Sequence, residues 1–277
     1  MENDYLKKSF IETANGRIFY FYDNSFPNRP FAVFLHGLSS NHTTWLKPME
    51  VLHQHKYNVL APDLRGHGFS DKIKNKKLYQ LPVFSNDLRE IIKKEGINSF
   101  ILIGYSFGGQ VALEYVSKYP ESIKGLVLLS TNHINPFKYW KINLLTPIAV
   151  GFLNLLAIAL LWQKKKTYYY YQHGKAEGYW GSVKHGLMTM PLSINLWMLS
   201  NMANIDFKES IKKIKVPTDI VWSKKDFFIT KTEIKDMANA IKGAKVIISK
   251  NENHFIGTNS QNETIEIIIN FLDNKFI

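Results

Sequence analysis

The hydrophobic pattern of the chain alternates between two periods. Short continuous apolar runs are typical of strands buried on both faces of a parallel sheet, whereas apolar positions three and four apart are typical of covering helices. We expect strands over residues 31–35, 58–61, 100–103, 125–129, 219–222 and 245–249. We expect helices through residues 45–52, 82–94, 107–118, 231–241 and 262–272.

The N-terminal segment adds two more strands. Asn15 and Gly16 form a turn dipeptide between two β-prone runs, which predicts a hairpin over residues 9–22. Strands that alternate with helices indicate the α/β class. The predicted architecture is therefore a mostly parallel eight-stranded sheet with helices on both faces.

This alternation stops between residues 131 and 205. The segment is rich in tyrosine, tryptophan and leucine, and it contains seven lysines but a single acid, Glu177. We interpret residues 131–205 as a helical cap inserted after the sixth strand, over the carboxyl edge of the sheet. The core domain then consists of residues 1–130 and 206–277.

Residues 142–162 of the cap carry no charge and are long enough to raise the question of a membrane span. A single crossing would place the two halves of the core domain on opposite sides of the membrane. A helix here would also carry one stripe of small or polar residues: Asn143, Pro147, Gly151 and Asn154. We therefore predict a cap helix with a broad apolar face. Peripheral membrane contact stays open, because three lysines at 164–166 closely follow Trp162.

The segment Gly-Tyr-Ser-Phe-Gly, residues 104–108, lies where a predicted strand meets a predicted helix. Such a turn is strained and holds the serine hydroxyl above the edge of the sheet. Gly104 and Gly108 would keep side chains out of a place where backbones approach closely. The five residues also occur by chance, so the remainder of the chain has to supply the other catalytic groups.

A serine hydroxyl needs an adjacent base, which an acid holds in the right tautomer. In this topology the acid and then the base follow the serine, each on a loop after a late strand. Asp226 follows the predicted strand 219–222, and His254 follows 245–249. His254 is the only histidine after residue 185. Asp219 and Asp206 remain alternative acids, although Asp219 falls inside a predicted strand.

Acyl transfer also requires hydrogen-bond donors for the oxyanion of the tetrahedral intermediate. The Phe107 N–H follows the nucleophile at a helix start, and a second donor is expected from the loop after strand 31–35. We favour the Leu38 N–H, since Gly37 allows that loop to turn tightly. His36, beside it, is more readily explained as a structural loop residue than as a second base.

Composition narrows the range of functions. The chain has no cysteine, which excludes a disulfide, a thiolate nucleophile and a cysteine-based metal site. The first residues lack the apolar core of a signal peptide, so we expect a cytoplasmic protein. The net charge of +12 comes from 31 scattered lysines and only four arginines. Lysine is poorly suited to bidentate recognition of bases or phosphates, so we expect no nucleic-acid partner.

Several segments together resemble the α/β-hydrolase superfamily, and more narrowly its lidded esterases, lipases and lactonases. They are His36-Gly37, the run DLRGHGFS at 63–70, the run GYSFGG at 104–109, Asp226 and His254. In the family the second run shapes the loop beneath the site, which implies structural roles for Asp63, Arg65 and His67. Haloalkane dehalogenases and epoxide hydrolases of this superfamily have an aspartate at the position of Ser106.

The resemblance implies a serine hydrolase that cleaves carboxylic esters of small to medium apolar acyl groups, without a metal or organic cofactor. The same triad would also serve a lactonase, an amidase or a C–C bond hydrolase. A ligand-binding or signalling protein with little turnover is the alternative from another class. Candidate substrate contacts are His36, Tyr105, Trp140, Phe152, Trp162, Trp180 and Trp197, and packing within the cap explains any single aromatic equally well.

Overall fold

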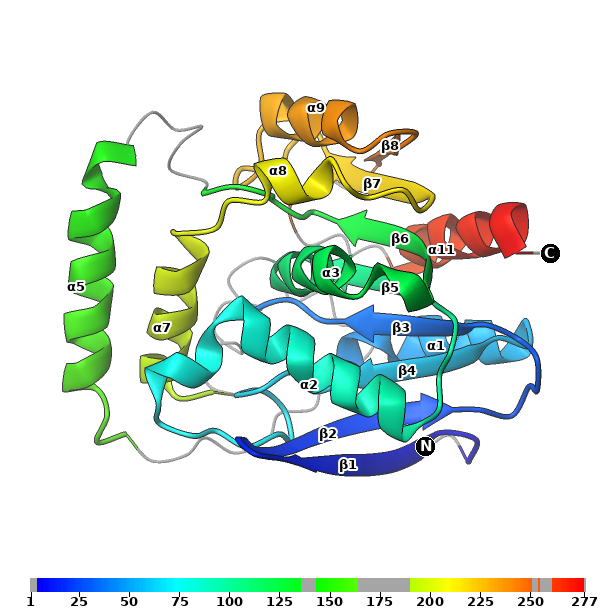
Figure 1. Ribbon diagram of the computed structural model, residues 1–277, viewed down its shortest axis with the longest axis horizontal. Helices are drawn as coiled ribbons and strands as arrows, with labels where there is room; N and C mark the ends of the chain where they lie inside the picture. Colours follow the sequence, from blue (N-terminus) through cyan, green and yellow to red (C-terminus); the bar gives the residue numbers. More distant parts are fainter. Residues whose placement is uncertain (1–3, 136–142, 164–189, 251–253, 255–260, 277) are drawn as a thin grey trace.

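Eight strands form one sheet in the computed structural model, which describes residues 4–135, 143–163, 190–250, 254 and 261–276. They lie in the order β1-β2-β4-β3-β5-β6-β7-β8, which confirms the predicted eight-stranded sheet (Figure 1). The strands are β1 Lys7–Thr13, β2 Gly16–Asp23, β3 Phe31–Leu35, β4 Asn58–Pro62, β5 Phe100–Tyr105, β6 Ile123–Leu129, β7 Thr218–Ser223 and β8 Lys245–Ser249.

The sheet is antiparallel at its N-terminal edge and parallel elsewhere. β1 and β2 form the expected hairpin, in which Thr13 pairs with Gly16 across a two-residue turn. Gly16 has φ +102°, a conformation that glycine adopts without strain. β2 pairs antiparallel with β4, and the remaining neighbours pair in parallel. The carboxyl ends of the parallel strands therefore meet at one edge, where ligands bind in sheets of this kind.

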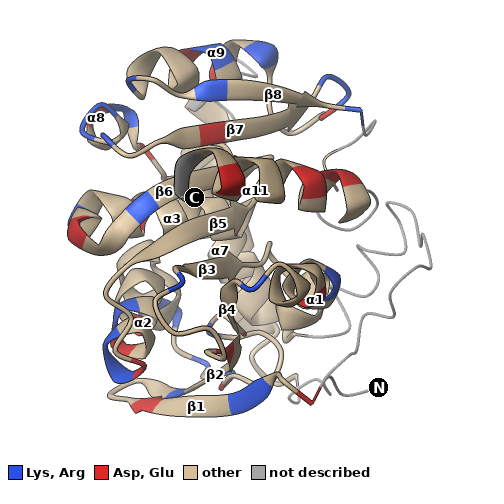
Figure 2. Cartoon of the chain, turned by 90° about the vertical axis from the view of Figure 1, so that its right-hand side faces the viewer, with Lys and Arg blue, Asp and Glu red and all other residues tan. Residues whose placement is uncertain are grey.

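Helices cover both faces of the sheet (Figure 2). One apolar cluster joins Trp45 and Leu52 of the first helical region to Phe271 near the C-terminus, and the cluster on the other face includes Phe84 and Val111. The first face is covered by η1 His42–Trp45, α1 Leu46–Gln54 and α11 Gln261–Phe276. The second is covered by α2 Leu81–Lys94, α3 Phe107–Lys118 and α9 Lys231–Ala240, with η2 Lys76–Tyr79 and η3 Pro120–Ser122 in the connections.

Between β6 and β7 the chain leaves the sheet. The described elements there are η4 Asn143–Leu145, α5 Thr146–Ala159, α7 Leu192–Met202 and α8 Lys208–Ile211. α7 lies over the carboxyl edge of the sheet, and α5 packs against the side of α7 that faces away from the sheet (Figure 1). No helix in the described ranges is long and apolar enough to cross a membrane.

The two ends of this insertion are held together. Ile134 and Asp206 form an isolated β-bridge. The Asn135 N–H donates to the Ile205 carbonyl at 2.9 Å, and the Phe207 N–H donates to the His133 carbonyl at 2.9 Å. The chain thus leaves and re-enters the core at one place, so the insertion does not disturb the order of the strands.

Candidate active site

Ser106 lies at the corner between β5 and α3. Its backbone has φ +51° and ψ −114°, a conformation that side-chain-bearing residues rarely adopt. Its N–H donates to the Leu129 carbonyl at the end of β6, at 2.9 Å. Strained residues of this kind persist only where their surroundings hold them. The sharp turn leaves the Ser106 side chain half-buried at the carboxyl edge of the sheet.

Two glycines allow this corner to form. A Cβ on Gly104 would lie 2.6 Å from Gly109 Cα, and a Cβ on Gly108 would lie 2.3 Å from the Leu35 carbonyl oxygen. Real Cβ atoms do not approach other atoms so closely. The close packing of α3 on β3 and β5 therefore requires glycine at both positions, which agrees with the expectation from the sequence.

The imidazole of His254 connects the serine to an acid. His254 Nε2 lies 3.0 Å from Ser106 Oγ, and His254 Nδ1 lies 2.8 Å from Asp226 Oδ2. With Nδ1–H donating to the carboxylate, Nε2 is left as the acceptor for the serine hydroxyl. The Tyr105 hydroxyl donates to the His254 carbonyl at 3.3 Å, and the Phe228 ring meets the imidazole edge-on at 4.9 Å. The imidazole is thus held on several sides.

Asp226 lies in the loop between β7 and α9, where the chain order predicts the acid. Its Oδ1 accepts the N–H groups of Phe228, at 2.9 Å, and Ile229, at 3.1 Å, which orients Oδ2 towards His254. Neither alternative acid is the partner of this histidine. Asp219 is paired within the sheet in β7, and Asp206 accepts the Lys208 N–H at 3.0 Å.

The loop after β3 lies against the serine. A Cβ on Gly37 would lie 2.9 Å from the Tyr105 ring and 3.6 Å from Ser106 Cβ. Leu38 follows in this loop, and Phe107 is the first residue of α3, whose N–H has no partner within the helix. The structure therefore brings both predicted amide donors to the neighbourhood of Ser106.

Two buried histidines bind this loop to the loop after β4. His36 Nε2 faces the Leu64 N–H at 3.0 Å, and His67 Nε2 faces the Ser39 N–H at 3.0 Å. Because each Nε2 must accept, each ring carries its proton on Nδ1. His36 Nδ1 then donates to the Gly37 carbonyl at 2.8 Å, and His67 Nδ1 donates to the Arg65 carbonyl at 3.0 Å.

The surroundings of both rings favour the neutral form. Burial lowers the pKa of His36 to about 4, despite the opposing attraction of Asp63. Burial also lowers the pKa of His67 well below its usual value, and the neighbouring His36 acts in the same direction. Both nitrogens of His36 face backbone groups inside the protein, so the suggestion that His36 contacts substrate needs correction: its ring orders the loop.

The run DLRGHGFS holds the loop after β4 in place. Asp63 is buried and accepts the His42 N–H, His42 Nδ1–H and Phe69 N–H, each at 2.8 Å. Burial by itself would raise the pKa of Asp63, but His42 outweighs it and the pKa is lowered. Arg65 forms a buried, two-pronged ion pair with Asp87, at 2.9 and 2.6 Å. These contacts fit the structural roles that the family resemblance implies.

The predicted aromatic substrate contacts separate into three groups. Tyr105 and Trp197 are buried: Tyr105 packs beneath His254, and Trp197 of α7 stacks on Tyr79 at 6.2 Å. Phe152 and Trp162 are 64% and 77% exposed on the outer side of the insertion. A side chain mostly in solvent does not line an enclosed acyl pocket, so these two assignments need correction. Trp140 and Trp180 lie outside the described residues.

Other residues close to the site were not predicted. The Asn195 side-chain amide of α7 donates to Ser39 Oγ, and that hydroxyl lies 3.5 Å from Met190 Sδ. Ile194 lies over Gly66, where an added Cβ would be 3.1 Å from it. Their sequence, Met-Pro-Leu-Ser-Ile-Asn, carries no motif, and its apolar pattern indicates only a helix. Contact between the insertion and the loop after β3 could not be inferred from it.

A buried glutamate lies next to the loop of the acid. Glu233 of α9 is fully buried, and its Oε1 accepts the His133 N–H at 3.1 Å, beside the start of the insertion. Burial raises the pKa of Glu233 to about 8, and the charge of Asp226 acts in the same direction. Within the described residues, no cluster of three or more His, Cys, Asp or Glu side chains could hold a metal ion.

Comparison with protein families gives one clear match. The family described as "alpha/beta hydrolase fold" matches residues 33–258. Uncharacterized proteins of Mycobacterium tuberculosis and Mycobacterium bovis are 32% identical over 105 residues, 38% of this chain and 30% of their own length. Epoxide hydrolase 3 of Xenopus tropicalis is 21% identical over 95% of this chain and 77% of its own length.

Solved structures show the same fold. An esterase from Exiguobacterium antarcticum superimposes with a TM-score of 0.75, at 18% identity, over 96% of this chain and all of its own. The enol-lactonase from Burkholderia xenovorans superimposes with a TM-score of 0.74, at 18% identity and the same coverage. At this identity the likeness concerns the arrangement of the elements.

Proposed function

The chain belongs to the α/β-hydrolase fold family, and on this premise we propose that it is a serine hydrolase of carboxylic esters. The observation that carries the proposal is the hydrogen-bonded row of Ser106, His254 and Asp226, at 3.0 and 2.8 Å. In this row each group has the partner that its catalytic role requires. The proposal assigns Ser106 as nucleophile, His254 as base and Asp226 as the acid that orients the imidazole.

The proposed reaction proceeds through an acyl-enzyme. Ser106 Oγ attacks the ester carbonyl carbon while its proton passes to His254 Nε2, and Asp226 stabilises the imidazolium. The Leu38 and Phe107 N–H groups donate to the oxyanion. The tetrahedral intermediate collapses as His254 returns the proton to the departing alkoxide. Water, activated by the same imidazole, then attacks the acyl-enzyme, and Ser106 and the carboxylic acid are released.

The identity of the proposed nucleophile, a serine, favours one type of reaction over another. Epoxide hydrolase 3 is a relative of this chain. In the family, epoxide hydrolases have an aspartate where this chain has Ser106, so we favour acyl transfer over epoxide opening. Phe228 is 37% exposed beside His254 and supplies apolar surface next to the proposed base. This surface favours an apolar acyl group of small to medium size.

The experiment that tests the proposal is labelling with a fluorescent fluorophosphonate, which reacts with activated serines. The wild type should be labelled, and Ser106→Ala and His254→Ala should not be. Ser117→Ala is the matched control, because the Ser117 hydroxyl only donates to the Leu113 carbonyl within α3. Hydrolysis of p-nitrophenyl esters of increasing acyl length would then measure the size of the acyl site. Loss of the triad serine should lower kcat by about a millionfold.

The opposite results are equally informative. A folded wild type that stayed unlabelled would overturn the proposal and favour a ligand-binding protein. Substantial ester turnover by Ser106→Ala would remove Ser106 from the mechanism. Labelling without ester turnover would keep the activated serine and overturn the substrate class, so lactones and amides would be tested next.

A further inference from the structure

The outer side of α5 is apolar and exposed in the part of the chain that the structure describes. Along η4, α5 and the short turn at residues 160–162 that follows it, seven large apolar side chains are between 55% and 86% exposed. They are Leu144, Leu145, Ile148, Phe152, Leu155, Ile158 and Trp162. From Ile148 onwards they recur at intervals of three and four, so they share one side of the helix. We call these seven residues the α5 outer face.

The opposite side of α5 is already used for packing. Ala157 is buried, and Leu153 and Leu160 pack against the hydrophobic core, where α5 meets α7. A surface helix normally carries polar residues on the side away from the core. α5 has apolar residues on both sides and no charged residue between 146 and 159. Large contiguous apolar patches on a protein surface mark sites of interaction with another surface.

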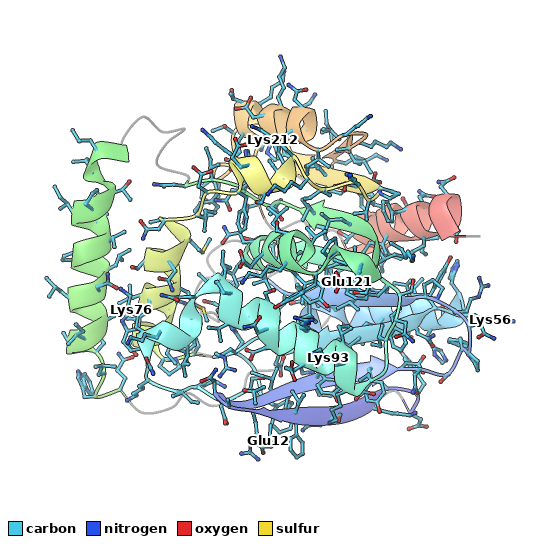
Figure 3. All side chains as sticks on the ribbon, in the orientation of Figure 1. Glu12, Lys56, Lys76, Lys93, Glu121 and Lys212 are labelled. Atoms are coloured by element: carbon cyan, nitrogen blue, oxygen red, sulfur yellow. The ribbon has the colours of Figure 1, made fainter. Side chains whose placement is uncertain are left out.

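The charged side chains that the structure describes beside the C-terminal end of α5 are lysines. The described residues of the insertion, 131–135, 143–163 and 190–205, include no Asp or Glu. At the C-terminal end of α5, Lys74 Nζ donates to the Leu161 and Gln163 carbonyls. Lys76 and Lys77 are exposed at the start of η2, which contacts α7, and Lys76 lies on the α5 side of the molecule (Figure 3).

We propose that the α5 outer face docks on the surface of an anionic lipid bilayer. A helix lies in the membrane interface when its apolar side enters the acyl boundary and nearby lysines meet the lipid headgroups. With 14 residues, α5 is about 21 Å long at 1.5 Å per residue, which suits lying along the interface. Trp162 lies at the same end as Lys74 and Lys76, and tryptophan is enriched at headgroup depth.

Charge complementarity selects this occupant over a second copy of the chain. A second copy offers no acid from the described insertion to meet Lys74, Lys76 and Lys77, so pairing through this face would leave these lysines uncompensated. An anionic membrane supplies negative charge and an apolar layer together. The docking does not depend on the proposed hydrolysis, so vesicle binding tests it separately.

The test is sedimentation with two kinds of vesicle at low salt: phosphatidylcholine alone, and phosphatidylcholine mixed with phosphatidylglycerol. The wild type should bind the mixed vesicles more strongly. The triple variant Ile148→Gln, Phe152→Gln, Leu155→Gln should lower the partition coefficient at least about tenfold. The control triple variant is Phe10→Gln, Val246→Gln, Ile248→Gln, which removes exposed apolar side chains from β1 and β8. It should bind as the wild type does.

A second pair of variants tests the charges. Lys76→Gln with Lys77→Gln should weaken binding to the mixed vesicles about tenfold and leave the weak binding to phosphatidylcholine unchanged. Lys93→Gln with Lys212→Gln gives the same net charge. Both lysines lie away from α5 (Figure 3), and they pair with Glu90 on α2 and with Glu209 on α8. This variant should therefore bind like the wild type.

Three results would overturn the proposal. The first is a wild type that does not bind mixed vesicles. The second is an α5 triple variant with an unchanged partition coefficient. The third is a triple variant with a markedly lower Tm, because the face would then be covered by the chain itself. A wild-type dimer in light scattering, lost in the triple variant and unaccompanied by vesicle binding, would assign the face to a second copy instead.

Discussion

The imidazole of His67 accepts the amide proton of Ser39 at 3.0 Å, so a side chain from the loop after β4 holds the backbone of the loop after β3. Ser39 directly follows Leu38, the proposed oxyanion donor. Ser39 has φ +61°, an unfavourable conformation for serine that needs such support. A residue without a role in proton transfer thus positions a group that would act on the transition state.

This contact predicts a selective effect of His67→Ala. Without its acceptor the Ser39 amide would relax and carry the Leu38 N–H away from the oxyanion. We expect kcat for a p-nitrophenyl ester to fall about 10- to 100-fold with little change in KM, less than the 10²–10³ lost with an oxyanion donor itself. The measurement is steady-state kinetics together with the Tm.

His67→Gln is the conservative comparison, because its amide oxygen restores an acceptor. We expect it to recover part of the lost kcat. If both variants lowered kcat only in proportion to their loss of folded protein, His67 would be a packing residue and not a positioning one.

The two buried histidines also predict a loss of stability in acid. Their pKa values are lowered in the folded protein, that of His36 to about 4, whereas in the unfolded chain they stay near 6.5. Their contribution is complete above pH 6.5 and is lost as the pH falls towards 4, by at most about 1.4 kcal/mol per pH unit for each histidine. Imidazole nitrogen shifts in NMR should show both rings neutral at pH 5.5. Ordinary titration near 6.5 would contradict this.

Glu233 predicts the opposite dependence on pH. Its pKa is raised from 4.5 to about 8, so its contribution to stability is complete below pH 4.5 and is lost as the pH rises through 8. Glu233→Gln has no proton to release. Relative to wild type, the gain in unfolding free energy of this variant should be about 4 kcal/mol larger at pH 8.5 than at pH 5, because each pH unit between 4.5 and 8 contributes about 1.4 kcal/mol. Urea unfolding at both values measures it; an equal difference at both would show that Glu233 does not titrate in this range.

Asp226→Asn tests the proposed acid. An asparagine retains the oxygen that accepts the Phe228 and Ile229 N–H groups but places an N–H opposite His254 Nδ1, which favours the wrong tautomer. We expect kcat to fall about 10⁴-fold with the fold intact. Asp219→Asn is the matched control in β7 and should leave fluorophosphonate labelling unchanged. The reverse ranking of the two variants would reassign the acid.

Two glycine-to-alanine substitutions distinguish the effect of close packing on stability from the effect of helix propensity. In Gly108→Ala the new Cβ would lie 2.3 Å from the Leu35 carbonyl oxygen and 2.6 Å from that of His36, so α3 must move. We expect a loss of about 3 kcal/mol in unfolding free energy and of most activity. Gly151→Ala meets nothing within 4 Å on α5 and should gain about 0.5–1 kcal/mol. Urea unfolding compares the two, and equal effects would show that the elbow tolerates a methyl group.

The strands could be predicted because burial on both faces of the sheet requires continuous apolar runs. Such runs, and the three- and four-residue spacing of the covering helices, can be recognised in the sequence without knowing which segments they contact. β8 begins and ends at the predicted residues, and β5 extends two residues further, to Tyr105. The placement of Asp226 beside His254 followed from chain order, because both residues come shortly after late strands that end at the carboxyl edge. A local pattern is informative where one strong physical requirement acts on neighbouring residues.

Contacts between distant segments could not be predicted in the same way. Nothing in the sequence indicates that His36 accepts a hydrogen bond from the loop after β4, or His67 one from the loop after β3. Each of these hydrogen bonds joins residues 28 positions apart. Phe152 and Trp162 were expected at a pocket, but a helix that is apolar on both sides does not reveal which side faces the core. The pKa of Glu233 depends on the packing of α9 against His133, which no local pattern records.

Ser106 and His254 are 148 residues apart in the chain, and this separation has a consequence during synthesis. A ribosome releases the elbow long before it releases the base, so a nascent chain with a formed elbow holds only a weak nucleophile. β8 must join the edge of the sheet before the imidazole can reach the serine. If the chain hydrolyses esters as proposed, the newly made protein is inert towards them until β8 is in place, and the onset of hydrolysis would report the completion of folding.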